Sequence, residues 1–258
     1  MTMIFSLFIF IFGLIVGSFL NCIVYRIEQE ESFLGGRSKC PKCQHSLGWK
    51  DLIPVFSFLF LKGKCHYCRE KISWQYPLVE LLTAFLFVLI LLPEIFIYNP
   101  QSIFVFLCLL FISCFLVLIF VYDLKNSLIP DRFIYPAIII SLIYQLFSGG
   151  QTFLNLLLAI LIGSGLFFFI FLISRGKWIG FGDVTLGLFM GLFLGFPNII
   201  VALFLGVFLG AIIGLGLMFY KKKKLSSEIP FGPFLITGTV ISFLFGKQII
   251  NWYLNFLI

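Results

Sequence analysis

Charged side chains are scarce in this sequence. Asp, Glu, Lys and Arg make up 11% of the 258 residues, 61% are hydrophobic, and the mean hydropathy is +1.12. Soluble globular proteins carry about 25% charged residues, so this chain lacks the polar surface that a soluble fold needs. Several apolar runs exceed the ~18 residues that mark a membrane-spanning helix. The composition therefore excludes a soluble globular class and predicts an all-α polytopic membrane protein.

The signatures of several hydrolase classes are also missing. Both histidines, His45 and His66, lie in one Cys-rich loop, and the chain has no H-E-x-x-H motif. It has no G-x-S-x-G motif either. A Ser127–Lys125 pair is disfavoured because residues two apart do not share a helix face. Motifs that read nucleic-acid grooves are absent, so the net charge of +7 does not indicate nucleic-acid binding.

The apolar runs predict about eight transmembrane helices. They cover residues 3–25, 76–92, 102–122, 133–147, 152–173, 178–196, 198–219 and 231–246. No Lys or Arg precedes the first run and no A-x-A site follows it, which argues against a cleaved signal peptide. With both termini outside, every Lys and Arg except Lys247 falls in a cytoplasmic loop, as the positive-inside rule requires.

This topology divides the chain into three parts. We expect a first transmembrane helix at 1–25, a cytoplasmic loop at 26–75, and a transmembrane helical core at 76–258. The last residues, 247–258, are expected along the membrane interface with Trp252 at headgroup level.

The cytoplasmic loop carries two C-x2-C pairs separated by 21 residues. The ligand residues are Cys40, Cys43, Cys65 and Cys68. Thiols stay reduced in the cytoplasm, and four thiolates in two short turns match tetrahedral zinc. Four Cys ligands leave no open coordination position, so the predicted zinc site is structural. Free thiols or a redox pair are the alternative interpretations.

Two acidic residues lie at or inside the predicted membrane boundary. Asp123 ends the third span, and Asp183 belongs to Gly180-Phe181-Gly182-Asp183. The 13 apolar residues after Asp183 make only ~20 Å of helix. That span is therefore expected to start near Trp178, with Asp183 about one turn inside the membrane.

Two carboxyl groups at one depth are typical of an aspartic-protease dyad. Neighbouring carboxyls share a proton, so one can accept a proton from water while the other donates to the peptide. The alternative is that each Asp is structural, as an interfacial cap or a partner for Lys125 or Arg132.

Glycines recur every four residues in the sixth and seventh spans. They are Gly187, Gly191 and Gly195, then Gly206, Gly210 and Gly214. This spacing lines one helix face and predicts close helix–helix packing, with chance as the alternative. Asp183 precedes Gly187 by four residues and is expected on the same face.

The sequence resembles the bacterial type IV prepilin leader peptidases, including the members that process competence pseudopilins. The resemblance rests on six motifs that follow one another along the chain. The motifs are Gly17-Ser18-Phe19-Leu20-Asn21 with Tyr25-Arg26, the paired C-x2-C loop, Tyr76-Pro77-Leu78-Val79-Glu80-Leu81-Leu82-Thr83-Ala84, Asp123-Leu124 with Ile129-Pro130-Asp131, Gly180-Phe181-Gly182-Asp183, and Ile229-Pro230-Phe231-Gly232-Pro233-Phe234. The resemblance covers nearly the whole chain.

The resemblance implies a bifunctional enzyme of the bacterial inner membrane. It would cut the basic leader from prepilin or pseudopilin substrates after a Gly, at the cytoplasmic face. It would then methylate the new N-terminus with S-adenosylmethionine. The family's catalytic aspartates fall on Asp123 and Asp183, whereas Asp131 stays outside the pair. Glu80 and Glu228 match motifs without a role that we can assign.

Two other functions stay open at this point. One is a peptidase that lacks methylation, and the other is an ion-coupled transporter whose intramembrane acids carry protons. The transporter would need acids deep in several spans, and most spans here have none.

Overall fold

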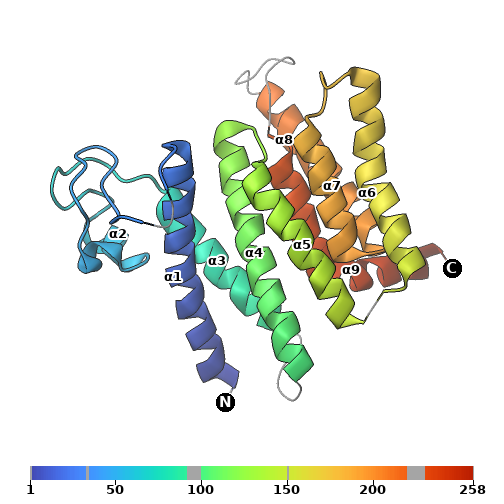
Figure 1. Ribbon diagram of the computed structural model, residues 1–258, viewed down its shortest axis with the longest axis horizontal. Helices are drawn as coiled ribbons and strands as arrows, with labels where there is room; N and C mark the ends of the chain where they lie inside the picture. The colour runs from blue at the N-terminus through green and yellow to red at the C-terminus, as the bar shows by residue number, and fades with distance from the viewer. Residues whose placement is uncertain (1, 33–34, 92–99, 150, 220–229, 258) are drawn as a thin grey trace. The chain divides into compact units, whose positions relative to one another are not determined.

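The computed structural model describes residues 2–32, 35–91, 100–149, 151–219 and 230–257. Over these residues every regular element is a helix, apart from two isolated β-bridges in the Cys-rich loop. The all-α class is therefore confirmed. The chain forms two compact units, Met1–Tyr98 and Asn99–Ile258, whose helices are labelled in Figure 1.

The first unit is a helix pair that carries the loop. Helices α1 (Thr2–Glu28) and α3 (Gln75–Leu91) pack closely because α1 presents Gly13 and Gly17 to its partner. A Cβ on Gly13 would lie 2.6 Å from the Ala84 Cα, and one on Gly17 would lie 2.7 Å from the Glu80 Cα. Between these helices the chain forms a short 3-10 turn, η1 (Trp49–Leu52), and α2 (Phe56–Phe60).

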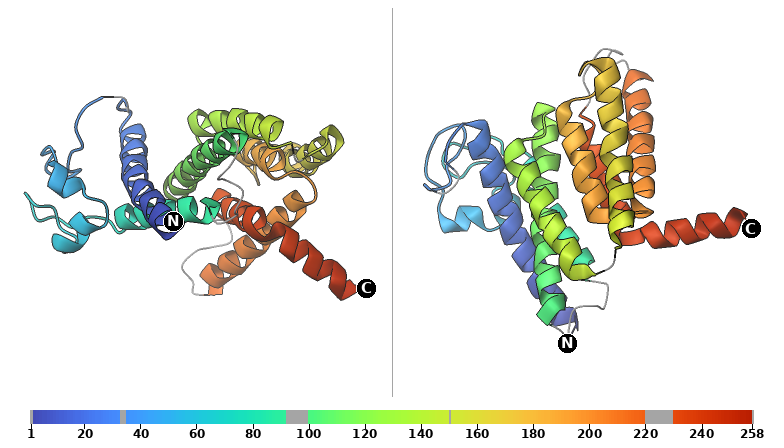
Figure 2. Two further views of the ribbon diagram at one scale, coloured as in Figure 1. Left: turned by 90° about the horizontal axis from the view of Figure 1, so that it is seen from below. Right: turned by 45° about the vertical axis from the view of Figure 1, so that its right-hand side comes forward.

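The second unit is a bundle of six helices within the described residues (Figures 1 and 2). They are α4 (Pro100–Asn126), α5 (Asp131–Ser148), α6 (Phe153–Ser174), α7 (Phe181–Leu194), α8 (Asn198–Phe219) and α9 (Gly232–Leu257). Helices that follow one another in the chain pack as pairs: α4 with α5, α6 with α7, and α8 with α9. The C-terminal end of α9 leaves the bundle in Figure 2, and its Trp252 is 68% exposed.

The predicted close packing at the spaced glycines is confirmed for Gly187 and Gly191 on α7 and for Gly206 on α8, and we call these contacts the glycine seams. A side chain on Gly187 would overlap the carbonyl oxygen of Gly163 on α6, and one on Gly191 would lie 2.6 Å from the Ala159 oxygen. Gly206 packs in the same way against α9. Gly195 does not belong to the seam, because it ends α7 with a φ of +67°. Small residues at every fourth position thus let these backbones meet directly.

Within the part of the chain that the structure describes, five helices are long and apolar enough to cross a bilayer, namely α1, α4, α6, α8 and α9. Helices α3 and α7 are apolar but shorter. Each predicted span coincides with a helix, and the count of eight spans stays a prediction. The sixth predicted span corresponds to α7, which begins at Phe181 instead of near Trp178, because Gly180 is extended (φ −74°, ψ 156°) and caps the helix.

Candidate active site and metal centre

Asp123 lies in the last turns of α4 and is only 3% exposed. Its Oδ2 atom is buried and has no hydrogen-bond partner within the described part of the chain. Burying a carboxylate without a partner is costly, and native structures contain few such atoms. An acidic residue in this position at the end of an apolar helix is a candidate functional residue.

The start of α9 lies against this carboxyl group. A Cβ at Gly232 would lie 2.5 Å from Asp123 Oδ2, closer than any real side chain approaches. A side chain at this position would therefore displace the Asp123 carboxyl group or the start of α9. The backbone of Gly232 also offers its N–H beside the carboxylate. Gly232 belongs to one of the six sequence motifs, but the sequence alone indicated no role for it.

Asp183 lies in the first turn of α7, directly after the Gly180 cap. Its side chain is partly buried, and its N–H donates to the Gly180 oxygen at 3.2 Å. The Asp123 carboxylate acts on Asp183 electrostatically. The structure thus places the two predicted acids close enough for their side-chain charges to interact.

Ile129 links the segments that carry these acids. It lies between α4 and α5, and its Cβ is 3.0 Å from the position that a Cβ on Gly182 would take. Its Cδ1 is 3.5 Å from the corresponding position on Gly232. The end of α4 and the starts of α7 and α9 therefore converge around one apolar side chain.

Other acids of the sequence motifs lie elsewhere. Asp131 is exposed in the first turn of α5. Glu228 and the run Lys221–Lys224 lie outside the described residues. Glu80 belongs to the first unit, where it is 6% exposed and accepts a hydrogen bond from the Val55 N–H at 2.7 Å.

The four predicted zinc ligands form one cluster. Their Sγ atoms all lie within 4.8 Å of one another, and those of Cys40 and Cys68 are 3.9 Å apart. Zn–S bonds of about 2.3 Å place tetrahedral sulfur atoms about 3.8 Å apart. The cluster therefore fits a metal ion such as zinc.

Each C-x2-C pair has the same backbone fold. In the first pair the Cys40 N–H donates to the His45 oxygen at 3.0 Å, and the Gln44 N–H donates back to Cys40 at 2.9 Å. The second pair repeats both bonds at positions 65, 69 and 70. Gln44 and Arg69 both adopt positive φ, which turns the chain so that each pair of thiols points to one side.

A polar contact braces the second pair. Asp51 lies 3.2 Å from the His66 ring nitrogen and accepts from the Tyr67 hydroxyl at 3.4 Å. Burial alone would raise the pKa of Asp51. Hydrogen bonds from the Gly48 N–H and from His66 outweigh the effect of burial, so the pKa of Asp51 is lowered. The histidines thus lie beside the cluster and are not part of the four-sulfur set.

Comparisons with known proteins cover both units. Residues 11–93 match the Bacterial Peptidase A24 N-terminal domain, and residues 109–215 match the Type IV leader peptidase family. The chain is 33% identical over 260 residues to the prepilin leader peptidase/N-methyltransferase of Bacillus subtilis, covering 96% of this chain and 97% of that protein. It is 31% identical over 276 residues to the protein of the same name from Aeromonas salmonicida, covering 96% and 93%.

No solved structure shows a significant match to this chain. The sequence matches extend over nearly the full length of these relatives. Their family and the five apolar helices together show that the chain is a multi-pass membrane protein. The chain belongs to the type IV leader peptidase family.

Proposed function

We propose that this protein is an intramembrane aspartic endopeptidase that removes the basic leader of prepilin-like substrates, with Asp123 and Asp183 as its catalytic pair. The observation that carries the proposal is the buried, unpartnered Asp123 oxygen, in a carboxyl group that acts electrostatically on Asp183. The full-length similarity to relatives named prepilin leader peptidase/N-methyltransferase points to the substrate class.

The chemistry follows from the coupling of two acids. One carboxylate accepts a proton from water as the water oxygen attacks the scissile carbonyl carbon. The other, protonated, donates to the carbonyl oxygen, and the C–N bond then breaks as the leaving amine takes a proton.

We place this site at the cytoplasmic face of the bacterial inner membrane, in an eight-span topology with both termini outside. The many Lys and Arg of the predicted cytoplasmic loops would not attract a basic leader. The apolar helical segment that follows the leader is therefore expected to dock between helices and present the scissile bond. Cleavage should then depend weakly on salt concentration.

We also propose that the four-cysteine cluster holds a structural zinc ion. The metal would fasten the loop of the first unit, which otherwise has little regular structure. The second activity in the relatives' name leads us to propose N-methylation of the new N-terminus with S-adenosylmethionine. Against a transporter stands the absence of any acidic residue from α6 and α8.

The test is to co-express a prepilin-like substrate with the wild-type chain, Asp123→Asn and Asp183→Asn. Asn keeps the shape of the side chain but cannot exchange the proton. We expect loss of the mass shift that marks leader removal in both variants, at unchanged membrane insertion. Asp131→Asn is the matched control and should cleave normally, because Asp131 is exposed and lies outside the pair. Near-normal cleavage by either active-site variant would refute the dyad.

A further inference from the structure

The Cys-rich loop of the first unit carries exposed apolar side chains on helix α2. One side of this helix is buried, because the Phe58 ring packs against Trp74 with 4.8 Å between the ring centroids. The other side exposes Phe56, Leu59 and Phe60, which are 56%, 61% and 83% exposed. We call these three side chains the α2 patch. A cluster of exposed apolar side chains on a loop marks a surface that binds a partner.

The position of the α2 patch along the membrane helices follows from the packing of α1 on α3. A Cβ on Gly17 of α1 would lie 2.7 Å from the Cα of Glu80 on α3, so these residues lie side by side. Gly17 precedes Arg26, the first basic residue of the chain, by nine residues, or ~13 Å of helix. Glu80 accepts a hydrogen bond from the Val55 N–H at 2.7 Å. The turn that enters α2 therefore lies beside the apolar part of α1, well below its basic end.

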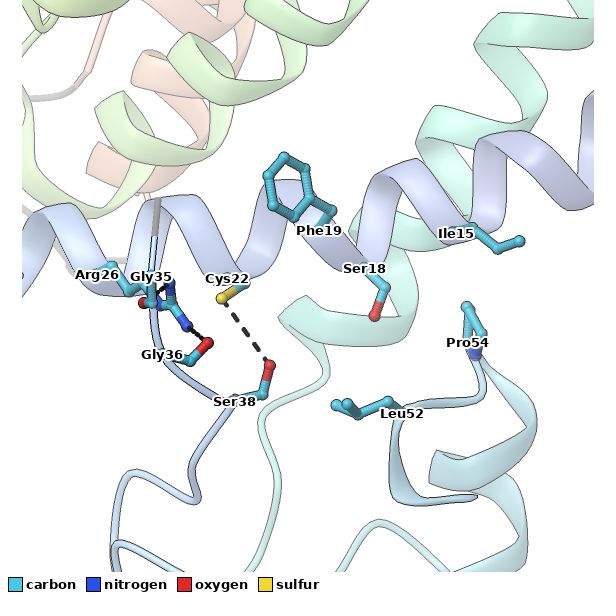
Figure 3. Close-up of a pocket in the computed structure, with 10 residues that line it drawn as sticks. All are labelled: Ile15, Ser18, Phe19, Cys22, Arg26, Gly35, Gly36, Ser38, Leu52 and Pro54. Carbon is cyan, nitrogen blue, oxygen red and sulfur yellow. Dashed lines mark hydrogen bonds between the residues drawn. The ribbon is translucent and has the colours of Figure 1, made fainter. Parts of the chain in front are cut away.

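Figure 3 shows the same course of the loop along α1. Near one end of the view, the Arg26 guanidinium donates to the Gly36 carbonyl oxygen at 2.8 Å. Towards the other end, Pro54 lies near Ile15, which precedes Arg26 by about three helical turns. The loop thus leaves α1 beside its basic end and returns to it beside apolar residues.

The backbone around α2 makes its hydrogen bonds within the protein. The N–H groups of Ser57, Leu59 and Leu61 each donate to the carbonyl oxygen four residues earlier, at 3.0, 3.1 and 2.9 Å. Val55 has a φ of +61° and begins the helix, and its N–H donates to the Glu80 carboxyl group instead. Water cannot satisfy backbone groups within hydrocarbon. A segment with these internal bonds can therefore enter the apolar layer, with an intramembrane acid as the partner of its first turn.

Positive charge surrounds the α2 patch. Lys50 precedes α2, Lys62 and Lys64 follow it, and all three are exposed. Between residues 35 and 74 the loop has eight basic and two acidic residues. A four-thiolate zinc site would subtract about two charges and leave the surplus positive. The apolar stem of a lysine lets its ammonium group reach water from an apolar surface. Anionic lipids of the cytoplasmic leaflet attract such residues.

We propose that residues 52–61 enter the cytoplasmic leaflet of the membrane, with the α2 patch among the acyl chains and the flanking lysines at anionic phospholipid headgroups. This is the arrangement of an interfacial amphipathic segment. A second copy of the chain would bring the same positive charge to the patch, and so would a basic leader. Anionic lipid is the partner that complements both the apolar side chains and the charge. The inference uses the proposed topology, which puts the loop on the cytoplasmic side, but not the aspartate pair.

Photo-crosslinking from position 60 tests the lipid contact. The photoreactive amino acid benzoylphenylalanine replaces Phe60 in the full-length protein, reconstituted in vesicles of phosphatidylcholine and phosphatidylglycerol. We expect a phospholipid adduct, detected by mass, with a yield close to that from the same replacement at Leu7, which is 58% exposed on apolar α1. Arg37 is the matched control, because it is exposed in the same loop but follows Gly36, which is bonded to Arg26 at the basic end of α1. Its lipid yield should be at least fivefold lower.

Two kinds of result would overturn the proposal. One is a lipid yield at position 60 no higher than that at position 37. The other is a crosslink from position 60 mainly to a second copy, to a co-reconstituted prepilin or to residues 99–258, because each would place protein on the α2 patch. The adduct should also form in the Asp123→Asn background, which is expected to cleave no prepilin. Failure of the lipid contact and failure of the peptidase proposal are therefore separate results.

A charge reversal tests the contact with headgroups. In the mixed vesicles, position 60 should form more phosphatidylglycerol adduct than the proportion of that lipid predicts. Lys50→Glu combined with Lys62→Glu should reduce this excess at least twofold. Lys247→Glu is the control, because it reverses a charge on the second unit. An undiminished excess in the double variant would contradict the role of the flanking lysines.

Discussion

Gly232 gives the sharpest test of the proposed active site. Gly232→Ala would place a methyl group 2.5 Å from Asp123 Oδ2, about 0.9 Å short of the 3.4 Å at which ordinary contacts begin. Either the carboxyl group or the start of α9 must move by that distance. A misplacement of about 1 Å can cost about 10²-fold in rate, or ~2.7 kcal/mol of activation free energy. We therefore expect prepilin cleavage to fall about 100-fold.

The loss should reflect geometry and not unfolding. Gly232 begins α9, and alanine has the higher helix propensity, so the helix itself should not weaken. The assay is the initial rate of leader removal by purified enzyme in detergent, with thermal stability measured in parallel. Gly165→Ala is the matched control, because a methyl group there meets nothing within 4 Å.

A graded variant strengthens this test. Gly182→Ala would place its methyl 3.0 Å from the Ile129 Cβ, a smaller overlap than the one at Gly232. Its rate should fall between those of the control and Gly232→Ala. If Gly232→Ala cleaved as fast as Gly165→Ala, the close contact with Asp123 would have no part in catalysis.

Three further predictions concern the rest of the chain. Cys40→Ser should abolish bound zinc, as measured by elemental analysis. Cys114→Ser should keep the zinc, because Cys114 lies outside the four-sulfur cluster to which Cys40 belongs. Gly187→Val should destabilise the second unit by about 1–3 kcal/mol through overpacking, measured as a lower melting temperature, with Gly216→Val unchanged because its surroundings are open. Glu80→Ala should remove the hydrogen-bond acceptor of the part-buried Val55 N–H, at a cost of about 1–3 kcal/mol. We expect faster hydrogen exchange in the turn before α2, with partial rescue by Glu80→Gln. Unchanged exchange would argue that Glu80 does not hold this turn in place.

Several elements could be predicted from the sequence because they depend on composition and local spacing. Apolar runs in a bilayer must be helical, and the eight predicted runs coincide with eight helices. Two C-x2-C pairs predicted the four-sulfur cluster, since each pair sets its own turn. The four-residue glycine spacing of Gly187 and Gly191 predicted the seam between α6 and α7 for the same local reason.

Boundaries and long-range contacts required the tertiary structure. Bilayer thickness suggested a helix start near Trp178, but the extended backbone of Gly180 delays it to Phe181. Residues 123, 129, 182 and 232 meet only because three helix ends converge, and no local pattern encodes that meeting. The bond between Glu80 and Val55 likewise joins residues 25 positions apart. The sequence alone determined which residue types carry the chemistry, and packing decided which of them meet, because close approach depends on whole helices and not on neighbours in the chain.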